Sequence, residues 1–237
     1  GLPYAGGQVW GSDFLPVLHQ GTRIIPGPES IVNMHRRKLT AAQQREELGL
    51  LEFFNRKHLK GRESDSNLRA RIKSFETAAG MQTAAPEAFD LSKESEATHK
   101  LYGLEPGDTS SFAWQCLVAR RLAERGVRFI QLYSGGGHIE DTWDGHNDCI
   151  SNHKLHAGET DQPIAALIAD LKRSGLWEET LLVWGGEFGR TPMAQGNGRD
   201  HHIKGFSIWM AGGGVQGGVS YGNTDDLGYN AEENIVH

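Results

Sequence analysis

Histidine and carboxylate side chains are concentrated between residues 138 and 202. Six of the eleven histidines lie in this stretch, interleaved with Asp and Glu residues. Imidazole and carboxylate groups together suit zinc, manganese or iron, because this ligand set spans borderline to hard character and lacks thiolates. Polar surface loops have a similar composition, so the spacing is less specific than a paired CxxC motif. The residues are His138, Glu140, Asp141, Asp144, His146, Asp148, His153, His156, Glu159, Asp161, Glu187, Asp200, His201 and His202.

Three short segments of this stretch could supply ligands to one ion. Asp144 and His146 are two residues apart on a loop that contains glycine, so both side chains could turn toward the same point. Glu187 follows an apolar run and lies between glycines, which allow unusual backbone angles. The pair His201 and His202 follows a glycine-rich loop.

Arginine and hydroxyl side chains near these segments could act on a substrate. Arg190 and Arg199 could hold a phosphate, sulfate or carboxylate group through two parallel hydrogen bonds. Arg190 could instead form a structural ion pair with Glu187. Ser134 and Thr191 are weaker candidates for a nucleophile, because neither lies in a GxSxG motif.

The elements that would position these residues follow a β–α–β order. Apolar runs predict strands over 127–133 and 180–184, and a further strand over 206–210. Apolar residues at helical spacing predict a helix over 162–174, with Asp161 as its N-cap. Strands in such a unit are usually parallel, and ligands bind beyond their carboxyl ends, where both polar clusters fall.

Other helices are expected before this unit. Thr40 and Gln43 fit a capping box at the start of a helix over 40–60, and a second helix is predicted over 64–79. Together they form a helical hairpin within residues 40–80. A connector follows over 80–108, with Pro86 near its start, and the last 20 residues are expected to be turns and loop.

An α/β core is predicted over residues 109–211. Its first helix runs from Thr109 or Ser110 to about Glu124 and ends at Gly126. The chain as a whole, residues 1–237, is expected to form a single α/β domain.

Composition limits the classes of protein to which this chain can belong. It has 237 residues, a formal net charge of −6 and 38% hydrophobic residues. A sequence pI near 6.0 argues against a general nucleic-acid-binding protein. No apolar run approaches the length of a membrane span. Cys116 and Cys149 are interpreted as two buried thiols rather than a disulfide.

The chain begins at Gly1 without a methionine and stops at Ile235-Val236-His237, which reads as the beginning of another element. We therefore expect a fragment of a longer protein that lacks strands at both ends. An apolar sheet edge left open in this way could also drive formation of a homo-oligomer.

The motifs WDGH, LLVWGGEFGRTP, GRDHH and GFSIWMAGGG resemble the domain of unknown function family 1501. That family is grouped with the alkaline phosphatase and sulfatase superfamily, and the resemblance covers essentially the whole chain. It implies an alkaline phosphatase-like sheet flanked by helices, incomplete at both ends in this chain. Family members usually carry an amino-terminal export signal, which implies a periplasmic or extracytoplasmic location.

The superfamily resemblance also implies a two-metal site at the carboxyl ends of the strands. Asp144 and His146 resemble its first ligand pair, and His201, or to a lesser degree His202, resembles a later histidine ligand. Glu187 stands where an aspartate follows a strand. Phe188 departs from the pattern, because a histidine would be expected at its position.

We therefore predict a metal-dependent hydrolase of phosphate or sulfate esters that acts on a small anionic ester. Zinc or manganese is expected, with iron or calcium as alternatives, and Arg190 is the predicted catalytic residue that holds the anion. The predicted metal ligands are Asp144, His146, Glu187 and His201, with His138, His202, Asp141 and His153 as additional candidates.

Two alternatives remain open at this stage. The first is a non-catalytic binding or scaffold protein that retains the fold and holds a structural metal, which Phe188 and the lack of a visible nucleophile favour. The second is a glycoside hydrolase that uses Asp144 and Glu187 as its paired carboxylates.

Overall fold

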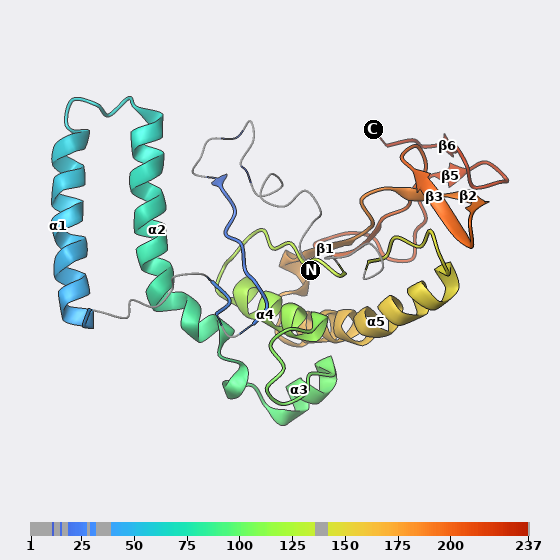
Figure 1. The fold of residues 1–237 in the computed structure, drawn as a ribbon, viewed down its shortest axis with the longest axis horizontal. Coiled ribbons are helices and arrows are strands. Elements are labelled where there is room, and N and C mark those ends of the chain that lie inside the picture. Colours follow the sequence, from blue (N-terminus) through green and yellow to red (C-terminus); the bar gives the residue numbers. More distant parts are fainter. Residues whose placement is uncertain are drawn as a thin grey trace. The chain divides into compact units, whose positions relative to one another are not determined.

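The computed structural model describes residues 11, 15, 19–27, 29–31, 39–135 and 142–236 (Figure 1). Contacts divide the chain into two compact units, one that ends at Glu94 and one that begins at Ser95. The described residues form a mixed α/β structure, as predicted.

The first unit contains the predicted helical hairpin, α1 (Ala41–Leu59) and α2 (Ser66–Phe89). The capping box is also confirmed. The Thr40 hydroxyl accepts a hydrogen bond from the Gln43 N–H, and the Gln43 side chain accepts one from the Thr40 N–H. These bonds satisfy two backbone donors at the start of α1.

Helix α2 continues ten residues beyond its predicted end at Ala79. Pro86, which the prediction placed in a connector, lies inside the helix near its end. The added turns bury Ala88, which is 1% exposed, and carry Gln82, which bonds to Gln44 of α1, so packing holds the helix despite the cost of Gly80 and Pro86. The connector is therefore shorter than expected, and the one-turn helix η3 (Leu91–Lys93) follows.

The second unit contains the helices α3 (Glu96–Tyr102), α4 (Phe112–Glu124) and α5 (Cys149–Arg173). Ser111, rather than Thr109 or Ser110, caps α4 by accepting a hydrogen bond from the Trp114 N–H. The Asp108 carboxylate accepts the N–H groups of both Ser110 and Ser111, which places Ser111 at the cap position. Gly126 follows α4 at a φ of +80°, as the prediction of a C′ glycine requires.

Helix α5 begins thirteen residues before its predicted start at Gln162. Its N-cap is Asp148, whose carboxylate accepts the Ser151 N–H, and the predicted cap Asp161 is an exposed residue within the helix. The added turns bury His156 and Thr160, so tertiary packing extends the helix beyond the apolar pattern seen in the sequence.

The core of the second unit is made by α3, α4 and α5 and has a charged residue at its centre. Asp170 is 2% exposed. Its Oδ2 accepts the Tyr102 hydroxyl at 3.1 Å and lies 3.0 Å from Arg120 Nε, while its Oδ1 accepts Arg173 Nη2 at 2.6 Å. Because each carboxylate oxygen has a donor, the charge is stable inside the core.

All strand pairs among the described residues are antiparallel and two-stranded. β1 (Leu181–Trp184) pairs with β4 (Trp209–Gly212), and β2 (Gly189–Gln195) pairs with β3 (Gly198–His202). β5 (Asn223–Thr224) pairs with β6 (Ala231–Glu233) in the region predicted to be loop. The one-turn helix η5 (Trp177–Glu179) precedes β1.

The predicted parallel β–α–β unit is not formed by the described residues. Residues 127–133 are not part of a strand, and β1 pairs instead with the antiparallel strand β4, which begins at Trp209 rather than at Phe206. The β propensity of residues 127–133 favours an extended chain but does not supply a second strand to pair with. Phe129 in this segment is 83% exposed. The segments EFGRTP and GRDHH, for which no strand was predicted, supply the strands β2 and β3.

Within the described ranges, no helix is long and apolar enough to cross a membrane.

Replacing Asp170 with Asn should lower the free energy of unfolding by about 3–5 kcal/mol, because it removes the buried negative charge beside Arg120 and leaves that guanidinium only the part-exposed Glu124 as a charged partner among the ion pairs described. Urea denaturation followed by circular dichroism measures this change. Glu52→Gln, which breaks the exposed pair with Arg56, is the matched control and should cost about 0–1 kcal/mol. Equal effects of the two substitutions would contradict the role given to Asp170.

The two cysteines are free, and their reactivity should differ. Cys116 is 0% exposed, and its burial raises the pKa of the thiol to about 12, so at pH 8 it stays protonated and inaccessible. A thiol reagent should therefore modify one cysteine, Cys149, in the native protein and both after denaturation. Rapid modification of both thiols in the native protein would show that this packing is wrong.

Candidate metal centre

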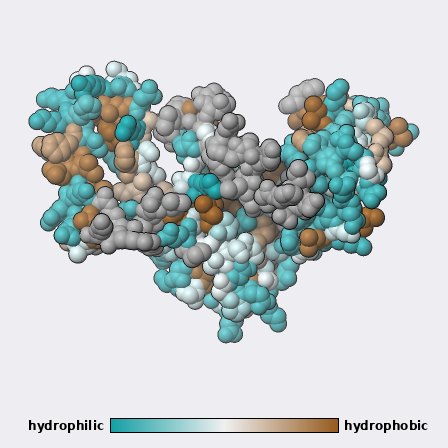
Figure 2. Space-filling model, viewed as in Figure 1, coloured by the Kyte–Doolittle hydropathy of each residue, from teal (hydrophilic) through white to brown (hydrophobic). Residues whose placement is uncertain are grey.

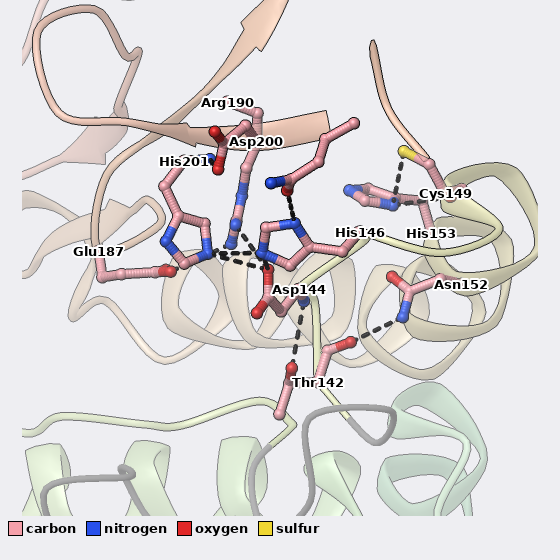
Figure 3. Close-up of polar contacts among 11 residues, drawn as sticks. Thr142, Asp144, His146, Cys149, Asn152, His153, Glu187, Arg190, Asp200 and His201 are labelled. Atoms are coloured by element: carbon pink, nitrogen blue, oxygen red, sulfur yellow. Dashed lines mark hydrogen bonds and ion pairs between the residues drawn. The ribbon is translucent and has the colours of Figure 1, made fainter. Parts of the chain in front are cut away.

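A loop and a β-hairpin together build the candidate site (Figure 3). The loop precedes α5 and carries Asp144 and His146, and the hairpin β2–β3 carries Arg190 and His201 as paired residues. β2 and β3 are joined by a two-residue turn, in which Gly196 has a φ of +57°, as the first position of a type II′ turn requires. The hairpin thus brings the EFGRTP and GRDHH segments side by side.

A close backbone contact holds the loop against the hairpin. The Gly145 carbonyl accepts a hydrogen bond of 3.1 Å from the Arg199 N–H. A Cβ atom at Gly198 would lie only 1.7 Å from the Gly145 oxygen, so a side chain at position 198 would push the loop away. The loop can therefore approach the hairpin this closely only with glycine at position 198.

Three donor atoms converge between the loop and β3. Asp144 Oδ1 lies 2.9 Å from His146 Nε2 and 3.1 Å from His201 Nε2, and the two histidine nitrogens are 2.9 Å apart. Neighbouring ligands of an octahedral ion bound at about 2.1 Å lie about 3 Å apart. Ligands of tetrahedral zinc bound at about 2.0 Å lie about 3.3 Å apart. We name Asp144, His146 and His201 the triad; its spacing is that of three ligands on one face of an ion.

The orientation of His146 is set by Gln195. The Gln195 side-chain oxygen can only accept a hydrogen bond, so the His146 Nδ1 that it contacts must be the donor. In the neutral imidazole this leaves the lone pair on Nε2, which faces Asp144 and His201. Such a partner on the other ring nitrogen is what metal-binding histidines generally have.

Arg190 links the triad to Glu187. Its Nη1 donates to Asp144 Oδ1 at 2.7 Å, and its Nη2 donates to Glu187 Oε1 at 3.1 Å. The guanidinium also lies over the Phe188 ring, 5.3 Å from its centre. Two carboxylates share one guanidinium, so the group keeps a net negative charge that favours a cation.

The triad is partly open to solvent. The side chains of Asp144 and His146 are 23% and 27% exposed, and that of His201 is 44% exposed. The Phe188 ring lies 4.6 Å from the His201 ring and covers one side of it. A small molecule could therefore reach an ion held by the triad.

The structure brings together three of the four predicted metal ligands. Glu187 is bonded to Arg190 and does not belong to the group of converging donors. Of the additional candidates, His202 is buried, and its Nε2 donates to the Tyr229 carbonyl. It forms no hydrogen bond with a triad residue among those described. His153 contacts the Cys149 carbonyl. His138 and Asp141 lie outside the described residues.

The candidate nucleophiles point elsewhere. The Thr191 hydroxyl donates to the Met193 carbonyl, and the Ser134 hydroxyl accepts the Trp143 indole N–H. Neither hydroxyl forms a bond to the triad.

Gln195 is the residue that the sequence analysis missed. It lies five residues from Arg190, an odd spacing that places two side chains on opposite faces of a regular strand. The pairing of β2 and β3 is irregular between Arg190 and Ala194, so the rule for a regular strand does not hold, and both side chains contact the loop. A bulge of this kind has no signal in the sequence.

The chain matches a family model described as a protein of unknown function (DUF1501) over residues 1–237. No curated protein and no solved structure gives a match.

Gln195→Ala should weaken the binding of a divalent metal by about 10- to 100-fold, because His146 loses the partner that sets its tautomer. Titration calorimetry with zinc and with manganese measures the affinity. Met193→Ala, an exposed position on the same strand, is the matched control and should leave the affinity unchanged. A wild-type affinity in Gln195→Ala would exclude this role.

Proposed function

The chain belongs to the DUF1501 family of proteins of unknown function, and we propose that it carries the metal centre of a hydrolase of phosphate or sulfate esters. The observation that carries this proposal is that His146, His201 and Arg190 all converge on one carboxylate oxygen, Oδ1 of Asp144. The ligands that we assign to the metal are Asp144, His146 and His201.

The donor set suits a catalytic rather than a closed structural ion. Three protein ligands leave coordination positions open, whereas structural zinc sites use four. A divalent ion held there would polarise an ester oxygen or lower the pKa of a bound water. The donors, 2.9–3.1 Å apart, fit an octahedral ion such as manganese and lie close to the spacing of tetrahedral zinc, so both metals are candidates. Two imidazoles and one carboxylate also bind iron(II) in oxygenases, so iron belongs among the metals to test.

Arg190 is placed to bind the anionic part of the substrate. Its guanidinium now bridges Asp144 and Glu187. When Asp144 serves as a metal ligand, its interaction with Arg190 weakens, and Nη1 becomes available to an oxygen of the ester. Glu187 and the Phe188 ring then hold the guanidinium beside the triad. Planar guanidinium groups recognise phosphate and sulfate through paired hydrogen bonds.

The alkaline phosphatase-like sheet and the second metal of that superfamily remain part of this proposal. The WDGH and GRDHH motifs support it, since they supply the triad. The extracytoplasmic location rests on the same resemblance.

A second function, a non-catalytic protein with a bound metal, is favoured by the hydrogen bonds of Arg190. Both of its terminal nitrogens are already bonded to carboxylates, as in a structural ion pair. Glycoside hydrolysis has less support. A glycosidase needs two carboxyl groups that face the substrate, one of them protonated, whereas Asp144 and Glu187 both face this guanidinium.

The proposal predicts hydrolysis of p-nitrophenyl phosphate or p-nitrophenyl sulfate by the whole protein loaded with manganese, zinc or iron. Asp144→Asn should abolish both metal binding and activity. Arg190→Ala should keep the metal but lower kcat/KM by about 100-fold or more, because a charged donor to the anion is lost. Metal content and steady-state rates are measured on the same samples.

Glu187→Gln tests whether Glu187 is a metal ligand or only holds Arg190 in place. It should retain the metal, and a loss as large as that of Asp144→Asn would make Glu187 a fourth ligand. Stoichiometric metal without hydrolysis of either ester would favour the non-catalytic function.

A further inference from the structure

The helical hairpin of the first unit separates positive from negative charge along its length. Its tip, residues 56–73, contains seven basic and two acidic residues, a net charge of +5. Its base, residues 41–55 and 74–90, contains one basic and six acidic residues, a net charge of −5. The hairpin is therefore neutral as a whole but strongly polarised from tip to base.

Large apolar side chains are exposed where the tip meets the base. Leu50, Leu51 and Phe54 precede the tip on α1 and are 57%, 49% and 53% exposed. Phe75 follows the tip on α2 and is 63% exposed. We name these four residues the apolar centre. Figure 2 shows apolar side chains at the surface of this hairpin.

Two of these residues belong to the faces that the helices turn toward each other. The Gln44 side chain donates to that of Gln82, which marks the facing stripes of α1 and α2. Leu51 lies seven residues after Gln44, and Phe75 lies seven residues before Gln82, so each lies on the same stripe as its glutamine. Two helices alone leave both residues about half exposed, whereas the centre of a four-helix bundle would cover them.

We propose that the hairpin pairs with the hairpin of a second copy of this chain as an antiparallel four-helix bundle. In this arrangement the tip of each copy lies against the base of the other, so opposite charges face each other at both ends. The apolar centre lies at the middle of each hairpin and therefore falls on the two-fold axis, where the same residues of both copies meet. This inference is independent of the metal centre.

Other partners fit these observations less well. A polyanion would be attracted by the tip but repelled by a base of equal and opposite charge, and it would leave the apolar centre uncovered. A parallel pair of hairpins would place tip against tip and base against base, which is repulsive at both ends.

Sedimentation of the whole chain at micromolar concentrations tests the proposal. We expect a dimer that weakens with added salt, because the Debye length falls from about 10 Å at 0.1 M to about 3 Å at 1 M. A monomer at every concentration and salt would overturn the proposal, and so would a dimer that strengthens with salt, as a parallel pair would.

Substitution of the apolar centre tests which surface is used. The double variant Leu50→Asp, Phe54→Asp should be monomeric and keep its helical circular dichroism. Leu227→Asp places one such charge at a 75% exposed leucine of the second unit and should leave the dimer unchanged. A dimer that survives the double variant would show that another surface holds the two copies together.

A charge exchange tests whether opposite charges on tip and base hold the two copies together. One variant reverses the tip (Lys57→Glu, Lys60→Glu, Arg69→Glu), and the other reverses the base (Glu46→Lys, Glu47→Lys, Glu52→Lys). Each alone should self-associate at least about tenfold more weakly than the wild type, because like charges then meet at both ends. An equimolar mixture should form a heterodimer, since the altered tip of one copy then faces the altered base of the other, and the native base faces the native tip. Failure of the mixture to associate, with both variants folded, would refute the antiparallel order.

Discussion

The candidate metal centre depends on the close approach of one loop to one β-hairpin. The Gly145 carbonyl bonds to the Arg199 N–H, and this contact is only possible because Gly198 has no side chain. It places Asp144 and His146 opposite His201, although 55 residues separate the two histidines. Gln195 then fixes the tautomer of His146, and Arg190 neutralises part of the negative charge. Each of these contacts requires that the loop stay on the hairpin.

Two carboxylates of the second unit have similar partners but different environments. Asp170 is 2% exposed among α3, α4 and α5, and its oxygens are held by Tyr102, Arg120 and Arg173. Asp144 is 23% exposed, and two of its three nitrogen partners are imidazoles. Arginine and tyrosine hold a buried charge permanently, whereas imidazoles on a partly open carboxylate can exchange their mutual contacts for a metal. This contrast identifies the first group as structural and the second as the candidate for chemistry.

The first unit combines two stable helices with apolar residues that these helices leave exposed. Its two helices are well capped, and their facing stripes meet through Gln44 and Gln82. Two helices have too little surface to cover Leu51 and Phe75 as well. Polarised charge with exposed apolar residues between its two ends is a pattern that a copy of the same hairpin complements. The two units therefore concentrate different properties, namely ligand chemistry in one and self-complementarity in the other.

Sequence alone determined the local features of this protein. The capping box of α1, the glycine that ends α4, the position of β1 and the cluster of histidines and carboxylates were all predicted, because each depends on neighbouring residues. The mixed α/β class followed from the same patterns. Three of four predicted metal ligands converge, although their binding of a metal stays a prediction.

Tertiary structure decided everything that depends on a distant partner. Residues 127–133 have the composition of a strand but lie in none, because a strand needs hydrogen bonds from another segment. Helix α5 extends back to Cys149 because packing buries His156 and Thr160. Glu187 bonds to Arg190 instead of joining the triad, and Gln195 contacts His146 from a strand whose pairing with β3 is irregular. Residue types and spacing therefore identified the candidate ligands, while the contact between loop and hairpin selected the three that converge.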